Sequence, residues 1–272
     1  MRPAIRAVLL AAVTALAIIP AAAAADNEAV TVSPGQMHGW AFYDDNTGGP
    51  GTGHMVAGPA TPPLGEGSAE LKLTGVNDRQ FLATGAHAGT ALGRIARLSY
   101  WTYQAYSATD VVNRRAITLQ FDVHYNSGNC NPASPSCYQG RLVYEPGVGE
   151  LNPPILSGWQ SWDALAGHWW ASNSGDFGSK NRCTQATPCT WAEVNANWPA
   201  ATINVALLFK AGGGWSAFTG NVDAFTIGVA GKGMTTYDFE PNGGNGDDGA
   251  SGDDQGNHDN HDNHEDLVAS DD

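Results

Sequence analysis

The chain has 272 residues, of which 27 are acidic and 13 are basic, so its formal net charge is −14 at pH 7. This acidic balance, without a basic stripe, argues against nucleic-acid binding, because phosphate contacts need a basic surface. Hydrophobic residues make up 42% of the chain and nine are tryptophan, which excludes disorder throughout and supplies enough apolar material for a sizeable core.

Residues 1–25 have the pattern of a signal peptide. Arg2 and Arg6 give a positive start, Ala7–Ile19 is an apolar run, and Ala23 and Ala25 fit cleavage after Ala25. An N-terminal membrane anchor is the alternative, but the run is shorter than the ~20 residues of a spanning helix. No later segment is long and apolar enough to span a membrane, so we expect a secreted, extracellular protein.

Strand patterns dominate the middle of the chain. In Ile117–Tyr125, apolar and polar residues alternate, which predicts a strand with one face in the core and the other in water. Ile203–Phe209 has the same period. The remaining expected strands are Ala69–Leu73, Ile95–Tyr106, Gly140–Tyr144, Val222–Val229 and Thr235–Glu240.

The one fair helix pattern is Trp191–Trp198, which Pro199 ends and Thr190 can cap. Many short strands with almost no helix predict an all-β fold, a jelly-roll-like two-sheet β-sandwich. We expect one such domain over residues 26–241, and a monomer.

The character of the chain changes over residues 242–272. From Gly243 to Asp272 there are ten acidic residues and no Lys or Arg, so we expect a disordered tail. Removing this tail and the signal leaves 17 acidic and 11 basic residues in the domain. The acidity of the chain therefore belongs mostly to its tail.

Four cysteines form two close pairs in the sequence, Cys130 with Cys137 and Cys183 with Cys189. Each pair brackets a short loop rich in Pro, Ser, Thr or Asn, which a local disulfide would pin. Three connectivities remain open on sequence grounds. A zinc site is the alternative, but the spacings are longer than zinc ligands usually have, and export favours oxidation.

Two groups of residues are weak metal candidates, although we expect no cofactor to be required. Asp44 and Asp45 lie in an Asn- and Gly-rich turn, and Asp238 and Glu240 end the last expected strand, so calcium could bind their oxygens. The alternative is ordinary turn chemistry. The tail histidines could chelate a transition metal loosely, or simply belong to a solubilising tail; they are His258, His261 and His264.

Aromatic clustering is the most informative functional signal. Six of the nine tryptophans fall between Trp159 and Trp198. A flat indole stacks on the apolar face of a sugar ring, and neighbouring polar groups bind its hydroxyls. The expected ligand-binding residues are Trp159, Trp162, Asp163, His168, Trp169 and Trp170. Core packing is the alternative for each tryptophan taken singly.

Catalytic patterns are few. A hydrolase that acts on polysaccharides needs two carboxylates, for which Glu145, Glu150, Asp163 and Asp223 are candidates. The sequence has no Gly-x-Ser-x-Gly elbow, no His-Glu-x-x-His and no phosphate-binding glycine loop. We therefore expect no catalytic residues.

Several segments together resemble secreted proteins of the actinobacterial type, which have a jelly-roll sandwich similar to carbohydrate-binding modules. The segments are residues 58–69 (GPATPPLGEGSA), 98–103 (LSYWTY), 140–146 (GRLVYEP) and 218–228 (FTGNVDAFTIG). The resemblance covers most of residues 30–240. It implies the fold and the compartment, and it transfers no catalytic residue. In residues 220–225, Asp223 is expected to bond loop amides.

These observations favour a secreted, non-catalytic binding module for a glycan or another extracellular surface. Two other classes stay open: a polysaccharide-acting hydrolase, and a structural or matrix protein whose tail captures cations. Two carboxylates that face each other across one sandwich face would favour the hydrolase. Exposed indoles without such a pair would favour the binding module.

Overall fold

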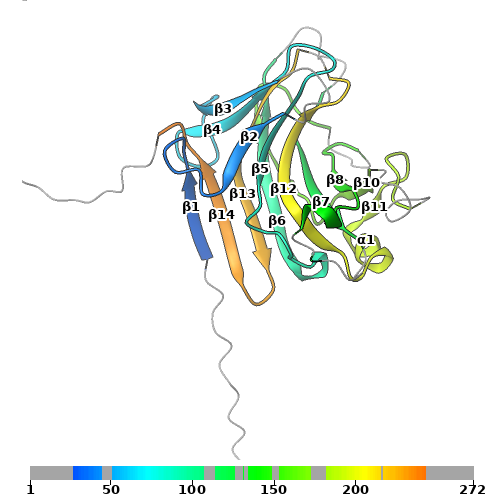
Figure 1. The fold of residues 1–272 in the computed structure, drawn as a ribbon. Coiled ribbons are helices and arrows are strands. Elements are labelled where there is room, and N and C mark those ends of the chain that lie inside the picture. The colour runs from blue at the N-terminus through cyan, green and yellow to red at the C-terminus, as the bar shows by residue number, and fades with distance from the viewer. Residues whose placement is uncertain are drawn as a thin grey trace, which may run out of the picture.

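The computed structural model describes residues 27–44, 51–106, 114–125, 131, 134–148, 153–172, 182–215 and 217–242. Within these ranges two seven-stranded sheets pack face to face as a β-sandwich (Figure 1), which confirms the all-β, jelly-roll-like fold expected from the sequence. No helix in these ranges has the length and apolar character needed to cross a membrane. The predicted signal and acidic tail lie outside the described residues.

Sheet A is antiparallel except where β1 runs parallel to β14. One edge of β13 pairs with β6, which in turn pairs with β9. The other edge of β13 pairs with β4 over Thr219–Val222 and with β14 over Phe225–Val229, so the sheet forks there. Its strands are β1 (Asn27–Val32), β3 (Thr52–Ala57), β4 (Gly67–Lys72), β6 (Ile95–Gln104), β9 (Trp159–Asp163), β13 (Thr219–Val229) and β14 (Gly233–Phe239).

Sheet B has the strand order β11-β10-β8-β7-β12-β5-β2 and is antiparallel throughout. Figure 1 shows β1 and β14 at one side of the molecule and β8, β10 and β11 at the other. The strands of sheet B are β2 (Trp40–Tyr43), β5 (Arg79–Thr84), β7 (Thr118–His124), β8 (Arg141–Tyr144), β10 (His168–Ala171), β11 (Cys189–Thr190) and β12 (Thr202–Gly212).

Every strand expected from the sequence overlaps an observed one, whereas β1, β2, β3, β5, β9, β10 and β11 were not predicted. The expected helix is α1 (Trp191–Asn197). Thr190 caps it as predicted: its hydroxyl accepts the Glu193 amide at 3.3 Å, while the Glu193 carboxylate accepts the Thr190 amide at 2.8 Å. Short 3₁₀ turns occur at η1 (Leu92–Arg94) and η2 (Pro135–Cys137).

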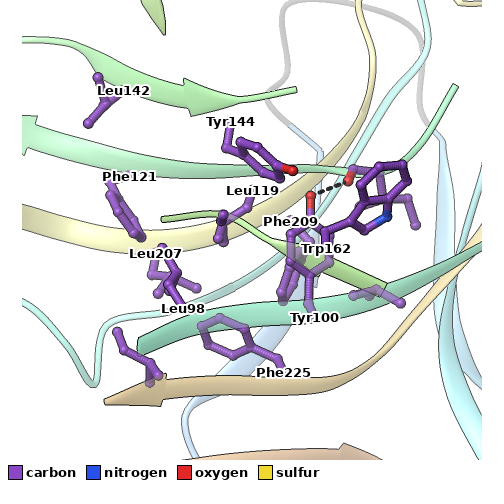
Figure 2. Packing of buried hydrophobic residues seen from close by; sticks show 14 of the residues in the cluster. Leu98, Tyr100, Leu119, Phe121, Leu142, Tyr144, Trp162, Leu207, Phe209 and Phe225 are labelled. Carbon is purple, nitrogen blue, oxygen red and sulfur yellow. Dashed lines mark hydrogen bonds between the residues drawn. The ribbon is translucent and has the colours of Figure 1, made fainter. Parts of the chain in front are cut away.

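Aromatic rings from both sheets form the centre of the core (Figure 2). Phe209 of β12 is fully buried, with ring centroids of Tyr100 and Phe225 in sheet A each 5.2 Å away. Trp40 of β2 stacks on Phe209 at 5.9 Å and contacts Phe239 edge-on at 5.2 Å. These contacts fix the two sheets against each other.

The polar face of β7 is buried, contrary to its predicted exposure to water. Thr118, Gln120, Asp122 and His124 are only 5%, 5%, 6% and 2% exposed, although they point away from the core. Their neighbours on sheet B and the adjoining loops cover them. A buried polar row needs internal partners, and these exist: the Gln120 amide donates to the Thr118 hydroxyl at 2.9 Å, and Arg141 donates to Asp122 at 2.8 Å.

Replacing the central aromatic ring should destabilise the fold strongly. For Phe209→Ala we expect the free energy of unfolding to fall by ~3–5 kcal/mol, because the variant loses buried apolar surface and leaves a cavity. Denaturant unfolding followed by circular dichroism measures this. Val76→Ala is the control: Val76 is 54% exposed, so its loss should cost no more than ~0.5 kcal/mol. Equal effects of the two variants would contradict the described core.

A half-buried histidine links the turn after β5 to β14. The His87 imidazole Nε2 lies 3.1 Å from the Tyr237 hydroxyl, and the two rings meet edge-on. Burial, and to a lesser extent the charge of Lys232, lowers the pKa of His87 from 6.5 to about 4. Folding therefore disfavours the protonated imidazole.

This shift predicts a loss of stability on acidification. Between pH 6.5 and about 4 the folded state binds fewer protons at His87 than the unfolded state does, so the free energy of unfolding falls as pH drops through this window. Above pH 6.5 the contribution is fully present. Denaturant unfolding across the window should show a shallower fall for His87→Gln than for wild type. His54→Gln, at a side chain 58% exposed, should follow wild type; identical pH profiles of all three proteins would refute the assignment.

Candidate ligand-binding groove on sheet B

The outer face of sheet B carries side chains that point away from the core. Successive side chains of a strand alternate between its two faces, and the strand register aligns those on the outer face in rows. One row contains Gln120, Val143 and Trp170, from β7, β8 and β10. The next row contains Lys210 of β12 beside Thr118 of β7. Polar, charged and aromatic groups thus meet on one surface.

Two adjoining hollows open on this face, and we refer to them together as the groove. Their volumes are about 290 and 240 Å³, and Arg115, Glu145 and Trp215 line both. Each volume is close to the lower end of the ~300–1,000 Å³ typical of small-molecule sites. The larger hollow is completed by Arg114 and the loops after β8, and the smaller one by the outer face of sheet B.

The wall of the smaller hollow is made of backbone at Gly212 and Gly213. Both residues have positive φ, +110° and +85°. A Cβ at Gly212 would collide with the backbone carbonyl of Asp78, so only glycine fits there. Backbone at Gly212 and Gly213 therefore forms this part of the wall.

Glu145 occupies the junction between the hollows. Its Oε2 accepts a hydrogen bond from the Trp170 indole at 3.3 Å and another from the Gln185 amide at 2.9 Å. These contacts hold the indole ring and the Gln185 side chain at one edge of the groove. The Glu145 carboxylate therefore orients its neighbours as well as lining the site.

The disulfide between Cys183 and Cys189 closes the loop that carries Gln185. This pairing was one of those expected from the sequence, and it is confirmed. Thr184 and Thr187 form an isolated β-bridge inside the loop, and this pairing holds the loop in a compact conformation. Cys137 is also disulfide-bonded, whereas Cys130 lies outside the described residues.

Cationic groups lie over aromatic rings on the same face. The Arg115 guanidinium is 5.2 Å from the centroid of Trp215, whose side chain is only 6% exposed. The Lys210 ammonium is 5.4 Å from the centroid of Phe81, and the Arg141 guanidinium is 5.2 Å from the same ring. Such cation–π contacts fix the position of a charge without cancelling it.

The structure separates the four tryptophans that the sequence suggested as one platform. Trp162 and Trp169 are core residues, 4% and 0% exposed, whose indoles donate to the Thr102 hydroxyl and the Ala164 carbonyl. They are therefore not accessible to a ligand. The physical reason is strand alternation, which turns one tryptophan of each neighbouring pair inward.

Trp159 lies on sheet A, away from the groove. Its indole donates to the Pro59 carbonyl at 2.9 Å, and its ring packs at a tilt against Tyr103. Trp170 is half-buried and lines the groove. Trp170 is thus the tryptophan of the predicted set that reaches this site.

The polar members of the predicted set are also placed elsewhere. Asp163 is exposed on β9 of sheet A, where its Oδ1 accepts the Leu165 amide at 3.1 Å in a turn. His168 begins β10 and is half-buried, next to Thr190 of β11. Neither residue lines the groove.

The sequence reasoning missed several residues that line the groove. They are Arg115, Gln120, Gln185, Lys210 and Trp215. The alternation in Ile117–Tyr125 did place Gln120 on the face opposite the core, and it was the usable signal. The other residues come from segments far apart in the chain, and only the strand pairing brings them together.

Of the carboxylates proposed for a hydrolase, the three that the structure describes, Glu145, Asp163 and Asp223, are not brought together. Among the described residues that line the groove, Glu145 is the only carboxylate. Asp163 lies on the other sheet, and Glu150 is outside the described residues. Asp223 accepts the amides of Leu64 and Phe239 through its two oxygens, each at 3.1 Å, as the sequence suggested.

The calcium candidates Asp238 and Glu240 lie at the end of β14. Oε1 of Glu240 accepts the amides of Glu66 and Gly67 at 2.8 and 3.2 Å. Oδ1 of Asp238 is buried and has no hydrogen-bond partner in the described part of the chain. Burial, followed by the charge of Glu240, raises the pKa of Asp238 to about 6.

Of the other metal candidates, the structure describes Asp44. Asp44 follows β2, while Asp45 and the tail residues His258, His261 and His264 lie outside the described residues. Within the residues that the structure does describe, no group of three or more His, Cys, Asp or Glu side chains could hold a metal ion. The orphaned Asp238 oxygen beside Glu240 is the feature that fits a hard cation best.

Comparisons with known proteins identify no family. No family model matches the chain, and no curated protein matches it. Among solved structures, the enzymatically active domain of bacteriophage CBA120 tailspike protein 4 aligns with 67% of this chain at 8% sequence identity and a TM-score of 0.32. The aligned region is 18% of that tailspike chain.

Calcium at Asp238 and Glu240 stays a prediction, and it can be tested by thermal unfolding. Calcium that binds the folded state raises the unfolding temperature by mass action. We expect a higher Tm in millimolar calcium than in chelator, and we expect Asp238→Asn to abolish the difference. Asp44→Asn, the matched control, should keep it. The same Tm of wild type in calcium and in chelator would exclude this site.

Proposed function

We propose that the protein is a secreted, non-catalytic binding module that holds a glycan in the groove on sheet B. The observation that carries this proposal is the half-buried Trp170 ring, which lies beside Glu145, Gln185 and Gln120 in the same hollow. An indole face and hydrogen-bonding side chains at one place match the two faces of a sugar, its C–H groups and its hydroxyls.

The rigidity of the site supports binding. Trp170 is held through its indole nitrogen by Glu145, which also receives the Gln185 amide from the disulfide-closed loop. A ring that is already oriented loses little side-chain entropy when a sugar stacks on it. The arrangement therefore favours binding by a preformed surface.

The outer face continues beyond the groove, which favours a polymer over a single sugar. Tyr43 of β2 is 38% exposed and stacks on Phe81 at 5.0 Å, in the same row as Lys210. Aromatic side chains thus occur on both sides of the central strands. An oligosaccharide lying across the strands could contact both ends of this face.

Two further points bear on the compartment and on catalysis. The Cys183–Cys189 disulfide is compatible with an oxidising, extracellular setting. Glycoside hydrolysis needs a pair of carboxylates, and the described lining of the groove has Glu145 alone. Binding without catalysis is therefore the function that this surface supports best.

Removing the Trp170 ring should abolish most glycan binding. On an array of plant, fungal and bacterial polysaccharides, we expect Trp170→Ala to bind the wild-type ligand about tenfold or more weakly, because a central tryptophan is a typical hot spot. Trp159→Ala removes a comparable ring from sheet A and should retain binding. Thermal unfolding of both variants verifies that they are folded.

Two results would contradict this proposal. The first is wild-type binding that survives Trp170→Ala and is lost in Trp159→Ala, which would move the site to sheet A. The second is the absence of binding by the wild-type protein to any polysaccharide on the array. Hydrolysis products released by the wild-type protein would instead restore the hydrolase alternative.

A further inference from the structure

Gln185 is held in one orientation at the edge of the groove. It is exposed in the loop between Cys183 and Cys189, and it lines the smaller hollow. Its amide Nε2 donates to Glu145 Oε2 at 2.9 Å. An ionised carboxylate only accepts hydrogen bonds, so the amide nitrogen has to face Glu145 and the carboxamide oxygen cannot take that place. The orientation of this acceptor oxygen is thereby fixed.

The loop that carries Gln185 is attached to β10 on both sides of Trp170. Cys189 of β11 pairs with the residue before Trp170, and the Cys183 carbonyl accepts the amide of the residue after it at 2.8 Å. The disulfide joins these two attachment points, whose Cα atoms are 5.0 Å apart. Gln185 therefore has a fixed position relative to the Trp170 ring.

Two acceptor oxygens flank the hydrogen bond between Gln185 and Glu145. Glu145 uses one carboxylate oxygen, Oε2, for both the Trp170 indole and the Gln185 amide. Within the described part of the chain, no donor bonds to the other carboxylate oxygen, Oε1, or to the Gln185 carboxamide oxygen. Both side chains line the same hollow as Trp170. The groove thus offers two acceptors beside the indole ring.

Acceptor oxygens select ligands that carry donors. A sugar hydroxyl can donate a hydrogen bond, whereas a methyl ether has no proton to give. We infer that Gln185 and Glu145 determine the specificity of the groove by accepting hydrogen bonds from two neighbouring free hydroxyls of a sugar that lies against Trp170. This inference rests on the proposed glycan binding and names its ligand class, a polysaccharide with neighbouring unsubstituted hydroxyls.

Oligosaccharides with free and with methylated hydroxyls test this ligand class. Cellohexaose, laminarihexaose and mannohexaose are each compared with their permethylated forms by isothermal titration calorimetry. Permethylation keeps the sugar rings and their C–H faces but removes every hydroxyl donor. We expect at least one free hexasaccharide to bind about tenfold or more tightly than its methylated form, because the methylated form leaves both acceptors unpaired.

The variant Gln185→Lys separates a direct contact from a positioning role. The lysine ammonium can still donate to Glu145, but it has no oxygen that accepts a hydroxyl. We expect this variant to bind the free hexasaccharide about threefold to tenfold more weakly, and the methylated form within about twofold of wild type. Gln36→Lys is the matched control, at an exposed glutamine that does not line the groove, and should match wild type with both forms. Thermal unfolding verifies that both variants are folded.

Each outcome decides between the two claims. Equal binding of free and methylated hexasaccharides, still lost in Trp170→Ala, overturns the hydroxyl inference and leaves the glycan proposal standing. An equal loss for both forms in Gln185→Lys also overturns the inference, because Gln185 would then act only by holding its neighbours in place. Failure to bind any of the three free hexasaccharides overturns the inference, and the polysaccharide array then decides the broader proposal by itself.

Discussion

The groove depends on the packing of Trp169 beneath it. This indole is fully buried, stacks on Phe121 at 5.2 Å and lies 5.1 Å from Trp191, and its nitrogen donates to the Ala164 carbonyl. Since neighbouring residues of a strand face opposite ways, the inward position of Trp169 directs Trp170 outward. The core packing of Trp169 therefore determines that Trp170 lies on the outer face of sheet B, and with it the residues that Trp170 contacts.

The polar side chains that are buried on the outer face of sheet B also need hydrogen-bond partners. The β7 side chains bond to one another, to β12 and to β8, so the floor of the site is held by hydrogen bonds as well as by strand pairing. Burial raises the pKa of Asp122, while its ion pair with Arg141 acts in the opposite direction. These hydrogen bonds make the floor of the site rigid.

Much of the fold could be predicted from the sequence, because its signals are local. Alternation located β7 and β12, the Thr190 and Glu193 pair defined the start of α1, and close spacing suggested the Cys183–Cys189 disulfide. The missed strands β9 and β10 have no such signal. Trp169 and Trp170 are chemically identical neighbours, so polarity cannot tell which one faces the core; the pairing of β10 with β8 decides it.

The site could be predicted only in part for the same reason. The sequence identified Trp170 and drew attention to Glu145, but it grouped Trp170 with residues that belong to another sheet or to the core. The cations of the groove come from the chain before β7 and from β12, and Trp215 follows β12. The residues of this site come together only when the seven strands of sheet B pair in the correct register. No local sequence pattern specifies that register.

The measurement that tests the account most directly is ¹⁹F NMR of the protein labelled with 5-fluorotryptophan, titrated with the polysaccharide that it binds. The nine tryptophan signals are assigned by single Trp→Phe variants. The account predicts that the Trp170 signal shifts most, that Trp215 responds through the groove wall, and that Trp159 on sheet A stays unchanged. A shift confined to Trp159, with Trp170 unaffected at saturation, would contradict the placement of the binding site on sheet B.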